Sequence, residues 1–384
     1  MQTPIPLRLF VSKHRSNRII VIRLEYKNDT IMISPTSRQN AILVILSEQK
    51  SSSSDVFSKL QSTVHASALV TIKRDLDELL EAHLCTREGA GRSTLYCITA
   101  LGLLLTAYDL NSYLGMPPDT RGGSKVFNFE LFSNWPTQLL SNSRSVVLQA
   151  ATTKYIEISR ELSSVVQAKE LERFIVELAW KSSAIEGNTY TLRDTERLLS
   201  LGMTTPGYAQ AETQMIINHK TALQFVLNEA QKNPGQVFVE EVHALLTFDL
   251  GVVRGVRKTL VGITGTSYRP LDNQYQINEA LAALYTTIAR LENPIEKAFL
   301  ALVGISYIQP FEDGNKRTAR LVANGILLAH NCAPLSYRSV EVEQYRSAMV
   351  LFYERNSAAA VLDIFFEQYL FATDNYRVLS GVKN

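Results

Sequence analysis

The sequence predicts a mainly α-helical protein with a small N-terminal unit and a larger C-terminal unit. Apolar residues recur at helical spacing over most of the chain from residue 41 onward. Only three short stretches, 18–33, 84–98 and 252–268, combine β-branched or alternating residues with turn residues as β-hairpins do. Glycine and proline gather at 115–123, so we expect the boundary between the two units there.

The bulk composition is typical of a globular, water-soluble protein. Of 384 residues, 20% are charged and 46% hydrophobic, and the net charge of +2 argues against a strongly basic nucleic-acid protein. The 3 cysteines are scattered and lack metal-ligand spacing, which predicts a reduced, cytoplasmic protein. The first residues contain no apolar signal core, and no apolar run reaches membrane-spanning length, so we expect no membrane partner.

The N-terminal third begins with a basic segment, 1–37, in which the alternation over 18–26 predicts a β-hairpin. Six basic and two acidic residues give it a net charge of +4. Residues 38–110 then show three helical stretches followed by a hairpin, the order of a winged helix-turn-helix. If this unit binds DNA, the major groove would be contacted by Thr71, Lys73 and Arg74, and the backbone by Arg92 at the hairpin turn. Seven basic and seven acidic residues balance over 38–106, so the alternative is a unit for protein contacts.

Residues 111–145 are predicted to be a linker, after which helical periodicity resumes. The helix expected at about 169–188 ends in Ser182 and Glu186, four residues apart, with a glycine next to the glutamate. A carboxylate at a helix C-terminus opposes the helix dipole and favours a cation nearby. Either Glu186 has a specific cationic partner, or it is a surface residue close to any lysine.

The most informative stretch is 309–320. An apolar helix is expected before it, Pro310 and Gly314 interrupt the pattern, and a second helix is expected from about residue 315. This second helix begins with Lys316, Arg317 and Arg320, although helix N-termini favour acidic residues. The sequence therefore predicts either an anionic ligand such as a phosphate at this helix start, or a solvated basic turn.

The same stretch resembles the signature loop of the Fic/Doc family, written HPFxDGNGRxxR. It departs from that pattern at Gln309, where the family has histidine, and at Lys316, where most members have glycine. The resemblance implies a helical Fic domain over 146–384 with a β-hairpin flap at 252–268, and transfer of AMP from ATP to a protein hydroxyl. The matching residues are Pro310, Phe311, Asp313, Gly314, Asn315, Arg317 and Arg320.

The resemblance also implies roles for individual residues. Asp313 would hold Mg²⁺, while Gly314, Asn315 and Lys316 would lie along the phosphates of ATP. Arg317 would bind the β-phosphate and Arg320 the γ-phosphate. Tyr345 either lies near the adenine ring or packs in the core, and the flap would bind the target protein through Gly265, Thr266 and Tyr268.

The helix end at Ser182 to Gly187 is similar to the family's inhibitory motif, [S/T]xxxE[G/N]. The similarity implies that Glu186 pairs with Arg320 and takes the space of the ATP γ-phosphate, with Ser182 stabilising the helix. Gln309 cannot accept a proton, and losing a general base costs about 10²–10⁴-fold in rate. The chain is therefore either a degenerate member of the family or an inactivated form of an active one.

Three functions remain open from the sequence. The first is an autoinhibited protein adenylyltransferase that modifies another protein or itself. The second is a DNA-binding transcriptional regulator, with the Fic core as a nucleotide sensor. The third is a kinase like the Doc proteins, which have lysine at the position of Lys316. A homodimer is a further possibility in each case.

Overall fold

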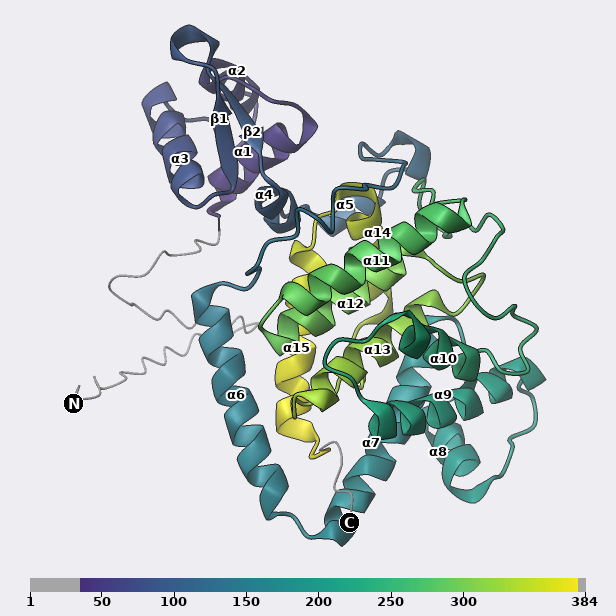
Figure 1. Ribbon diagram of the computed structural model, residues 1–384. Coiled ribbons are helices and arrows are strands. Elements are labelled where there is room, and N and C mark those ends of the chain that lie inside the picture. Colours follow the sequence, from purple (N-terminus) through teal and green to yellow (C-terminus); the bar gives the residue numbers. More distant parts are fainter. Residues whose placement is uncertain (1–34, 379–384) are drawn as a thin grey trace, which may run out of the picture.

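The computed structural model describes residues 35–378 and shows a predominantly helical protein (Figure 1), as predicted. A small N-terminal unit lies at one end of a larger helical body. The hairpin predicted within 18–33 lies outside the described residues, as does all but the end of the basic segment 1–37. Within the described part, no helix is both long and apolar enough to cross a lipid bilayer.

The N-terminal unit has the predicted order of elements. It consists of α1 (Ser37–Glu48), α2 (Ser53–Leu60), α3 (Leu69–Glu81), β1 (Cys85–Glu88) and β2 (Leu95–Ile98). The two strands pair antiparallel, with Cys85 opposite Ile98. This unit has its own apolar core, which includes Ile42, Ile72 and Leu76. Its identity as a winged helix-turn-helix stays a prediction.

Local polar contacts explain where the helices of this unit begin. Thr36 and Gln39 form a capping box at the start of α1, and Ser52 and Asp55 form another at the start of α2. In α2, Ser52 is the N-cap and Asp55 is the third helical residue. In both cases a side-chain oxygen satisfies a main-chain N–H that the helix leaves unpaired.

The predicted linker, 111–145, is packed against the body. It contains α5 (Leu110–Leu114), preceded by α4 (Ala100–Leu105), and a short 3₁₀ turn at Pro118–Thr120. Its second half has no long helix, yet it contributes buried side chains to the main core: Phe127, Leu131, Phe132, Trp135, Leu139 and Leu140. The connection is therefore part of the fold, because apolar side chains of this size are removed from water.

The body is a bundle of helices around the buried helix α12. Every residue of α12 from Ile295 to Ile308 is buried, and α12 packs along α13 and against α11 and α14 (Figure 1). Apart from Glu296, Lys297 and Ser306, the side chains of α12 are mostly apolar on all sides, as expected at the centre of a large fold. The helices are α6 (Asn142–Glu161), α7 (Ser164–Ile185), α8 (Leu192–Leu201), α9 (Gln210–Glu229), α10 (Gln236–Leu246), α11 (Gln274–Arg290), α12 (Pro294–Ile308), α13 (Asn315–Ala329), α14 (Val342–Arg355) and α15 (Ala359–Asn375).

The prediction of a β-hairpin flap at 252–268 is wrong, because this segment contains no strand. Its two ends bond to the body, and the hydrogen bonds within it are local, from Arg257 Nη1 to the Thr259 carbonyl and from the Tyr268 N–H to Thr266 Oγ1. The main-chain N–H of Arg257 donates to the carbonyl of Pro310 at 2.9 Å, and its Nε donates to the carbonyl of Gln309 at 2.7 Å. Tyr268 is buried and bonds to the main chain of α12. Because Arg257 near one end of the segment and Tyr268 at the other are bonded to the body, the two ends do not pair with each other as strands.

Candidate functional site

The loop 309–314 joins α12 to α13 through two left-handed residues. Gln309 ends α12 with φ of 52°, and Gly314 precedes α13 with φ of 78°. A Cβ on Gly314 would lie 3.0 Å from a side-chain methyl of Thr247, so glycine suits this position in both backbone conformation and space. The tight turn points the N-terminus of α13 at a cavity, where its first main-chain N–H groups lack intrahelical partners.

This cavity has a volume of about 630 Å³, within the range of small-molecule sites. Five parts of the chain form its walls: the connection at Leu114 and Arg121, the end of α7, segment 261–265, loop 309–316 and one face of α14. The wall residues used below are Arg121, Glu186, Gly265, Gln309, Asp313, Gly314, Lys316, Glu343, Tyr345 and Arg346.

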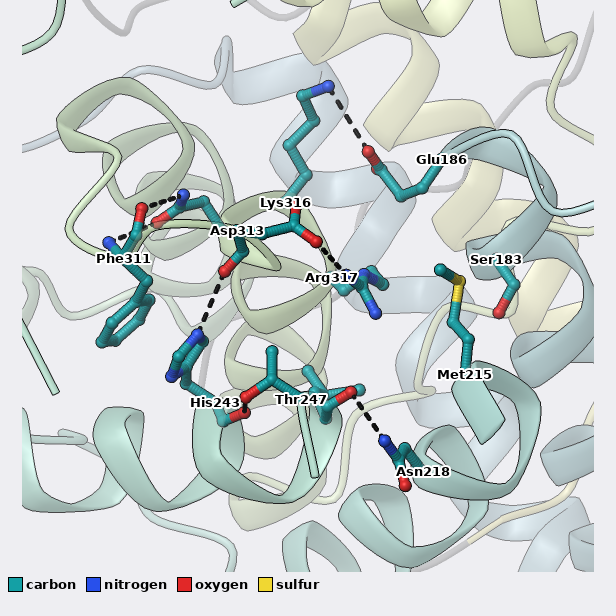
Figure 2. A network of polar contacts seen from close by, with 12 residues as sticks. Ser183, Glu186, Met215, Asn218, His243, Thr247, Phe311, Asp313, Lys316 and Arg317 are labelled. Carbon is teal, nitrogen blue, oxygen red and sulfur yellow. Dashed lines mark hydrogen bonds and ion pairs between the residues drawn. The ribbon is translucent and has the colours of Figure 1, made fainter. Parts of the chain in front are cut away.

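Glu186 lies at the C-terminal end of α7 and contacts two cations of α13. Its Oε1 accepts a hydrogen bond from Arg320 Nη2 at 2.9 Å. Its Oε2 lies 3.4 Å from Lys316 Nζ, a contact that Figure 2 shows. Burial would raise the pKa of Glu186, but the charges of Arg320 and Lys316 outweigh it and hold that pKa below its usual value. The carboxylate is therefore ionised. The contact with Arg320 expected from the sequence is present.

Arg320 and Ser182 extend this contact into a directed chain of hydrogen bonds. Arg320, fully buried, donates from Nε to Ser182 Oγ at 2.9 Å and from Nη2 to the Ser182 carbonyl at 2.8 Å. Because arginine only donates, the Ser182 hydroxyl can donate onward to His219 Nε2, 2.9 Å away. His219 Nδ1 then faces the carbonyl of Met215 at 3.1 Å. These hydrogen bonds join α7, α9 and α13.

Arg317 is held by the loop itself. Its Nη2 donates to Asp313 Oδ2 at 2.9 Å (Figure 2), and it is only 2% exposed, whereas the Asp313 side chain is 69% exposed. Among the described residues, Nε and Nη1 of Arg317 and Nη1 of Arg320 are buried without a hydrogen-bond partner. Unsatisfied buried donors are costly, so both guanidinium groups have capacity for further acceptors. Such acceptors could be phosphate oxygens.

The side-chain amide of Asn315 is bonded within the loop, and its predicted contact with phosphates stays a prediction. Its Nδ2 donates to the carbonyl of Phe311 at 2.8 Å and to Gln309 Oε1 at 3.0 Å, and its Oδ1 accepts from the Phe311 N–H at 2.8 Å. The Gln309 amide in turn donates to the carbonyl of Ser306 at 2.7 Å. Asn315 therefore stabilises the loop with its side chain.

The predicted flap residues face different ways. Gly265 lines the cavity, but Thr266 donates to Glu354 at 2.6 Å, and Tyr268 stacks on Tyr307 with ring centroids 4.8 Å apart. Thr266 and Tyr268 are thus bonded to the body in this structure. Tyr268 is buried, and an aromatic ring gains most by packing in the core. A role of these residues in binding a target protein stays a prediction.

Tyr345 is buried in α14 and still forms part of the cavity wall. The Arg320 guanidinium lies 5.9 Å from the centre of its ring, and the Tyr337 ring packs edge-on at 6.0 Å. Tyr345 therefore packs in the core, which was the alternative to a place near the adenine ring.

Sequence reasoning missed two histidines that support the site. His243 Nε2 donates to the carbonyl of Asp313 at 3.0 Å (Figure 2), and its ring stacks on Phe311 at 3.8 Å. Burial lowers the pKa of His243 to about 4 and that of His219 to about 3, the latter with help from the charge of Arg317. Both are neutral near pH 7. Each occurs singly within a helical pattern, so the sequence contains no signal for them.

Two further groups of predicted residues can be located. Within 35–378 no cluster of three His, Cys, Asp or Glu could hold a metal ion by itself. The exposed Asp313 carboxylate fits Mg²⁺ only in the manner of one carboxylate shared with substrate phosphates. On α3, Lys73 and Arg74 are exposed and Thr71 is half-buried, while the side chain of Arg92 lies outside what the structure describes.

Part of the chain is similar to proteins of known family. Residues 236–327 match the model of the Fic/DOC family. The chain is 26% identical over 217 residues to protein adenylyltransferase fic-1 of Caenorhabditis elegans, covering 50% of this chain and 43% of that protein. It is 29% identical over 172 residues to protein adenylyltransferase Fic of Nematostella vectensis, covering 43% and 40%. The chain thus spans about two fifths of the length of these relatives.

Solved structures show the same fold. Fic-1 (aa134–508) of C. elegans has a TM-score of 0.52 at 22% identity, with 61% of this chain and 72% of that chain covered. A Fic family protein of Desulfovibrio desulfuricans G20 has a TM-score of 0.52 at 20% identity, with 62% and 75% covered. At these identities the likeness concerns the fold alone.

Proposed function

We propose that this chain, which belongs to the Fic/DOC family, is an autoinhibited adenylyltransferase that transfers AMP from ATP to a Ser, Thr or Tyr hydroxyl of a protein. The observation that carries the proposal is Glu186. Its carboxylate contacts Arg320 and Lys316, two cations of α13. Glu186 also lines the cavity, which is large enough for a nucleotide. The curated relatives that bear the same family domain are protein adenylyltransferases.

In the proposed reaction, the protein hydroxyl oxygen attacks the α-phosphorus of ATP. The bond from this phosphorus to the oxygen that bridges to the β-phosphate breaks, pyrophosphate leaves, and the hydroxyl proton passes to a base. The N-terminus of α13 supplies main-chain N–H groups and the positive end of a helix dipole to the phosphates. Arg317 and Arg320 would neutralise the charge that develops on pyrophosphate. Mg²⁺, when bound at Asp313 together with the phosphates, would add further neutralisation.

Glu186 would inhibit by competing for the same cations. Arg320 and Lys316 are paired with its two carboxylate oxygens, and neither guanidinium of α13 lines the cavity in this conformation. A third phosphate of ATP would have to displace the carboxylate, because two anions in one small site repel each other. Arg346 strengthens the inhibitory position, since its Nε and Nη2 donate to the Ile185 carbonyl at 2.8 and 2.6 Å.

Gln309 would make the chemical step slow. A carboxamide cannot accept the hydroxyl proton, and both polar atoms of this side chain are already bonded, to Asn315 and to the Ser306 carbonyl. Water would then have to take the proton. Histidine at this position would supply the missing base, typically worth about 10²–10⁴-fold in rate.

Four forms of the full chain test the proposal: the protein as it is, Gln309→His, Glu186→Gly, and the double variant. Each is incubated with Mg-ATP and its intact mass is measured. We expect AMP adducts in the double variant, fewer in Gln309→His, and almost none in the two forms that keep Gln309. If Glu186→Gly, which keeps Gln309, formed as much AMP adduct as the double variant, the proposed role of position 309 would be contradicted.

The adduct itself separates AMP transfer from phosphate transfer. A phosphate adduct would support the Doc-like kinase alternative, in which Lys316 contacts ATP bound in the reverse direction. Glu343→Gln is a matched control for Glu186, because Glu343 is an exposed carboxylate of the same cavity wall. Absence of any adduct from the folded double variant would remove both transferase hypotheses.

A second candidate function is DNA binding by the N-terminal unit, which would make the chain a regulator that senses nucleotide. The observation in favour is that Lys73 and Arg74 are exposed on α3, the third helix before the hairpin, although Arg74 lies 3.8 Å from Glu78. A gel shift on the DNA upstream of its own coding sequence tests this function. We expect Lys73→Ala with Arg74→Ala to abolish the shift, and no shift with the unaltered protein would exclude it.

A further inference from the structure

A buried carboxylate joins three parts of the chain beside the cavity. Glu354 lies at the end of α14 and is 2% exposed. It accepts hydrogen bonds from the Tyr113 hydroxyl at 2.8 Å, from Thr266 Oγ1 at 2.6 Å and from Arg121 Nη1 at 3.4 Å. A carboxylate at a helix C-terminus faces the negative end of the dipole, and its burial is costly without donors. These donors, from the connection and from the cavity wall, are therefore required for its burial.

Arg121 connects the two donor segments directly. Its Nη1 also donates to the carbonyl of Gly265 at 2.9 Å, while Nε donates to Met116 and Nη2 to Leu114, both at main-chain carbonyls. The side chain is 7% exposed and lines the cavity. Because a guanidinium has donors in a rigid planar arrangement, the turn 114–121 and the wall at Gly265 are held at a defined separation.

The residue after Glu354 faces the N-terminal unit. Arg355 forms an ion pair with Glu48 at the end of α1, and its guanidinium lies 5.3 Å from the centre of the Tyr108 ring. The connection passes tightly over this place. A Cβ on Gly122 would overlap Arg355 Nη2, and one on Gly123 would lie 2.7 Å from the Glu354 carbonyl oxygen. The chain that follows Arg121 therefore passes directly over Glu354 and Arg355 at the end of α14.

We propose that Arg121 is a positioning residue for the protein segment that receives AMP, and that the seating of the N-terminal unit on Arg355 sets the place of Arg121. Arg121 acts through Gly265 on the wall 261–265, which faces the signature loop across the cavity. The role in substrate positioning rests on the proposed function. The mechanical link from Glu48 to the wall does not, because it follows from the contacts alone.

Hydrogen–deuterium exchange of the full chain tests the link without any activity. In Arg121→Gln and in Glu48→Gln, we expect amides of 259–268 to exchange about 10-fold faster or more, since a charge-assisted hydrogen bond is lost in each. Glu88→Gln is the control, because it breaks an exposed ion pair with Lys50 in the same N-terminal unit and is expected to leave 259–268 unchanged.

Amides of the buried α12 report whether a variant remains folded, and they are expected to stay protected in all three. If Arg121→Gln loses that protection, Glu48→Gln carries the test, since Glu48 is half-exposed and far from the core. Unchanged exchange of 259–268 in Glu48→Gln would overturn the link to the N-terminal unit. Unchanged exchange in a folded Arg121→Gln would overturn the positioning of the wall.

The role in catalysis is measured in the Gln309→His, Glu186→Gly background. There we expect Arg121→Gln to slow the transfer of AMP to protein about 10-fold, while the affinity for ATP, measured by titration, is unchanged. An equal rate with and without Arg121 would overturn its role for the substrate. No adduct in the parent double variant would instead count against the proposed function, and the exchange result would remain valid.

Discussion

Replacing Glu186 with glutamine is expected to destabilise the protein and at the same time to increase its response to ATP. The substitution leaves the guanidinium of Arg320, which is 0% exposed, without its anion. Removing one partner of a buried ion pair costs about 3–5 kcal/mol. Two bonds from Arg320 to Ser182 remain, and the Glu186 side chain is 18% exposed, so a loss of about 2–3 kcal/mol is expected here.

The same substitution removes the competitor of ATP. A ligand at 100 times its Kd stabilises the folded state by about 2.7 kcal/mol. We expect only Glu186→Gln to gain this full stabilisation from Mg-ATP. With about 2–4 °C per kcal/mol for a domain of this size, we expect the Tm to fall by roughly 5–10 °C without nucleotide. Saturating Mg-ATP should restore most of that loss.

Thermal unfolding of the unaltered protein, Glu186→Gln and Glu343→Gln, each with and without Mg-ATP, measures both effects. Glu343→Gln should match the unaltered protein, since its carboxylate is exposed. The reasoning would be refuted if Glu186→Gln had an unchanged Tm, or if Mg-ATP raised the Tm of all three proteins equally.

Four other perturbations have defined expectations. Lys316→Gln should change the free energy of unfolding, measured by denaturant titration, by only about 0–1 kcal/mol. The reason is that the ion pair between Lys316 and Glu186 is long and partly exposed. Gln309→His should raise the rate of adduct formation about 10²–10⁴-fold in rapid-quench assays. Folding lowers the pKa of His219 to about 3, so the stability that this residue contributes is full above the unfolded pKa near 6.5 and is lost as the pH falls from there toward the folded pKa. Over that pH range, His219→Gln should reduce the slope of the free energy of unfolding against pH by about 1.4 kcal/mol per pH unit. Urea unfolding at several pH values measures this slope. His243→Phe keeps an aromatic ring stacked on Phe311 but loses the hydrogen bond to the Asp313 carbonyl. We expect it to weaken ATP binding about 10-fold, measured by calorimetric titration. An unchanged affinity would show that this bond does not shape the loop.

The helical body and the signature loop were predictable because their signals are local. The periodicity of α12 and α13, and the break at Pro310 and Gly314, depend on residues within a turn or two of each other. Likewise, cations at the start of α13 and a carboxylate at the end of α7 each oppose a helix dipole, and therefore predict partners of opposite charge.

The error at 252–268 occurred where distant contacts override local preference. This segment has the composition of a hairpin, but Arg257 bonds it to Gln309, which lies 52 residues away in the chain. That bond has no signature in the neighbouring residues. The side chain of Asn315, by contrast, is held by a local contact, because its amide bonds to the main chain of Phe311, four residues earlier.

By itself, the sequence determined that the chain is mainly helical, that a basic helix start follows a tight loop, and that Gln309 cannot act as a base. The tertiary structure alone decided that Ser182, His219 and Arg320 form one chain of hydrogen bonds and that Arg121 holds the cavity wall. The physical reason is range. Helix dipoles, turns and periodicity act within one or two turns of chain, whereas Glu186 and Arg320 meet across 134 residues only because α7 packs against α13.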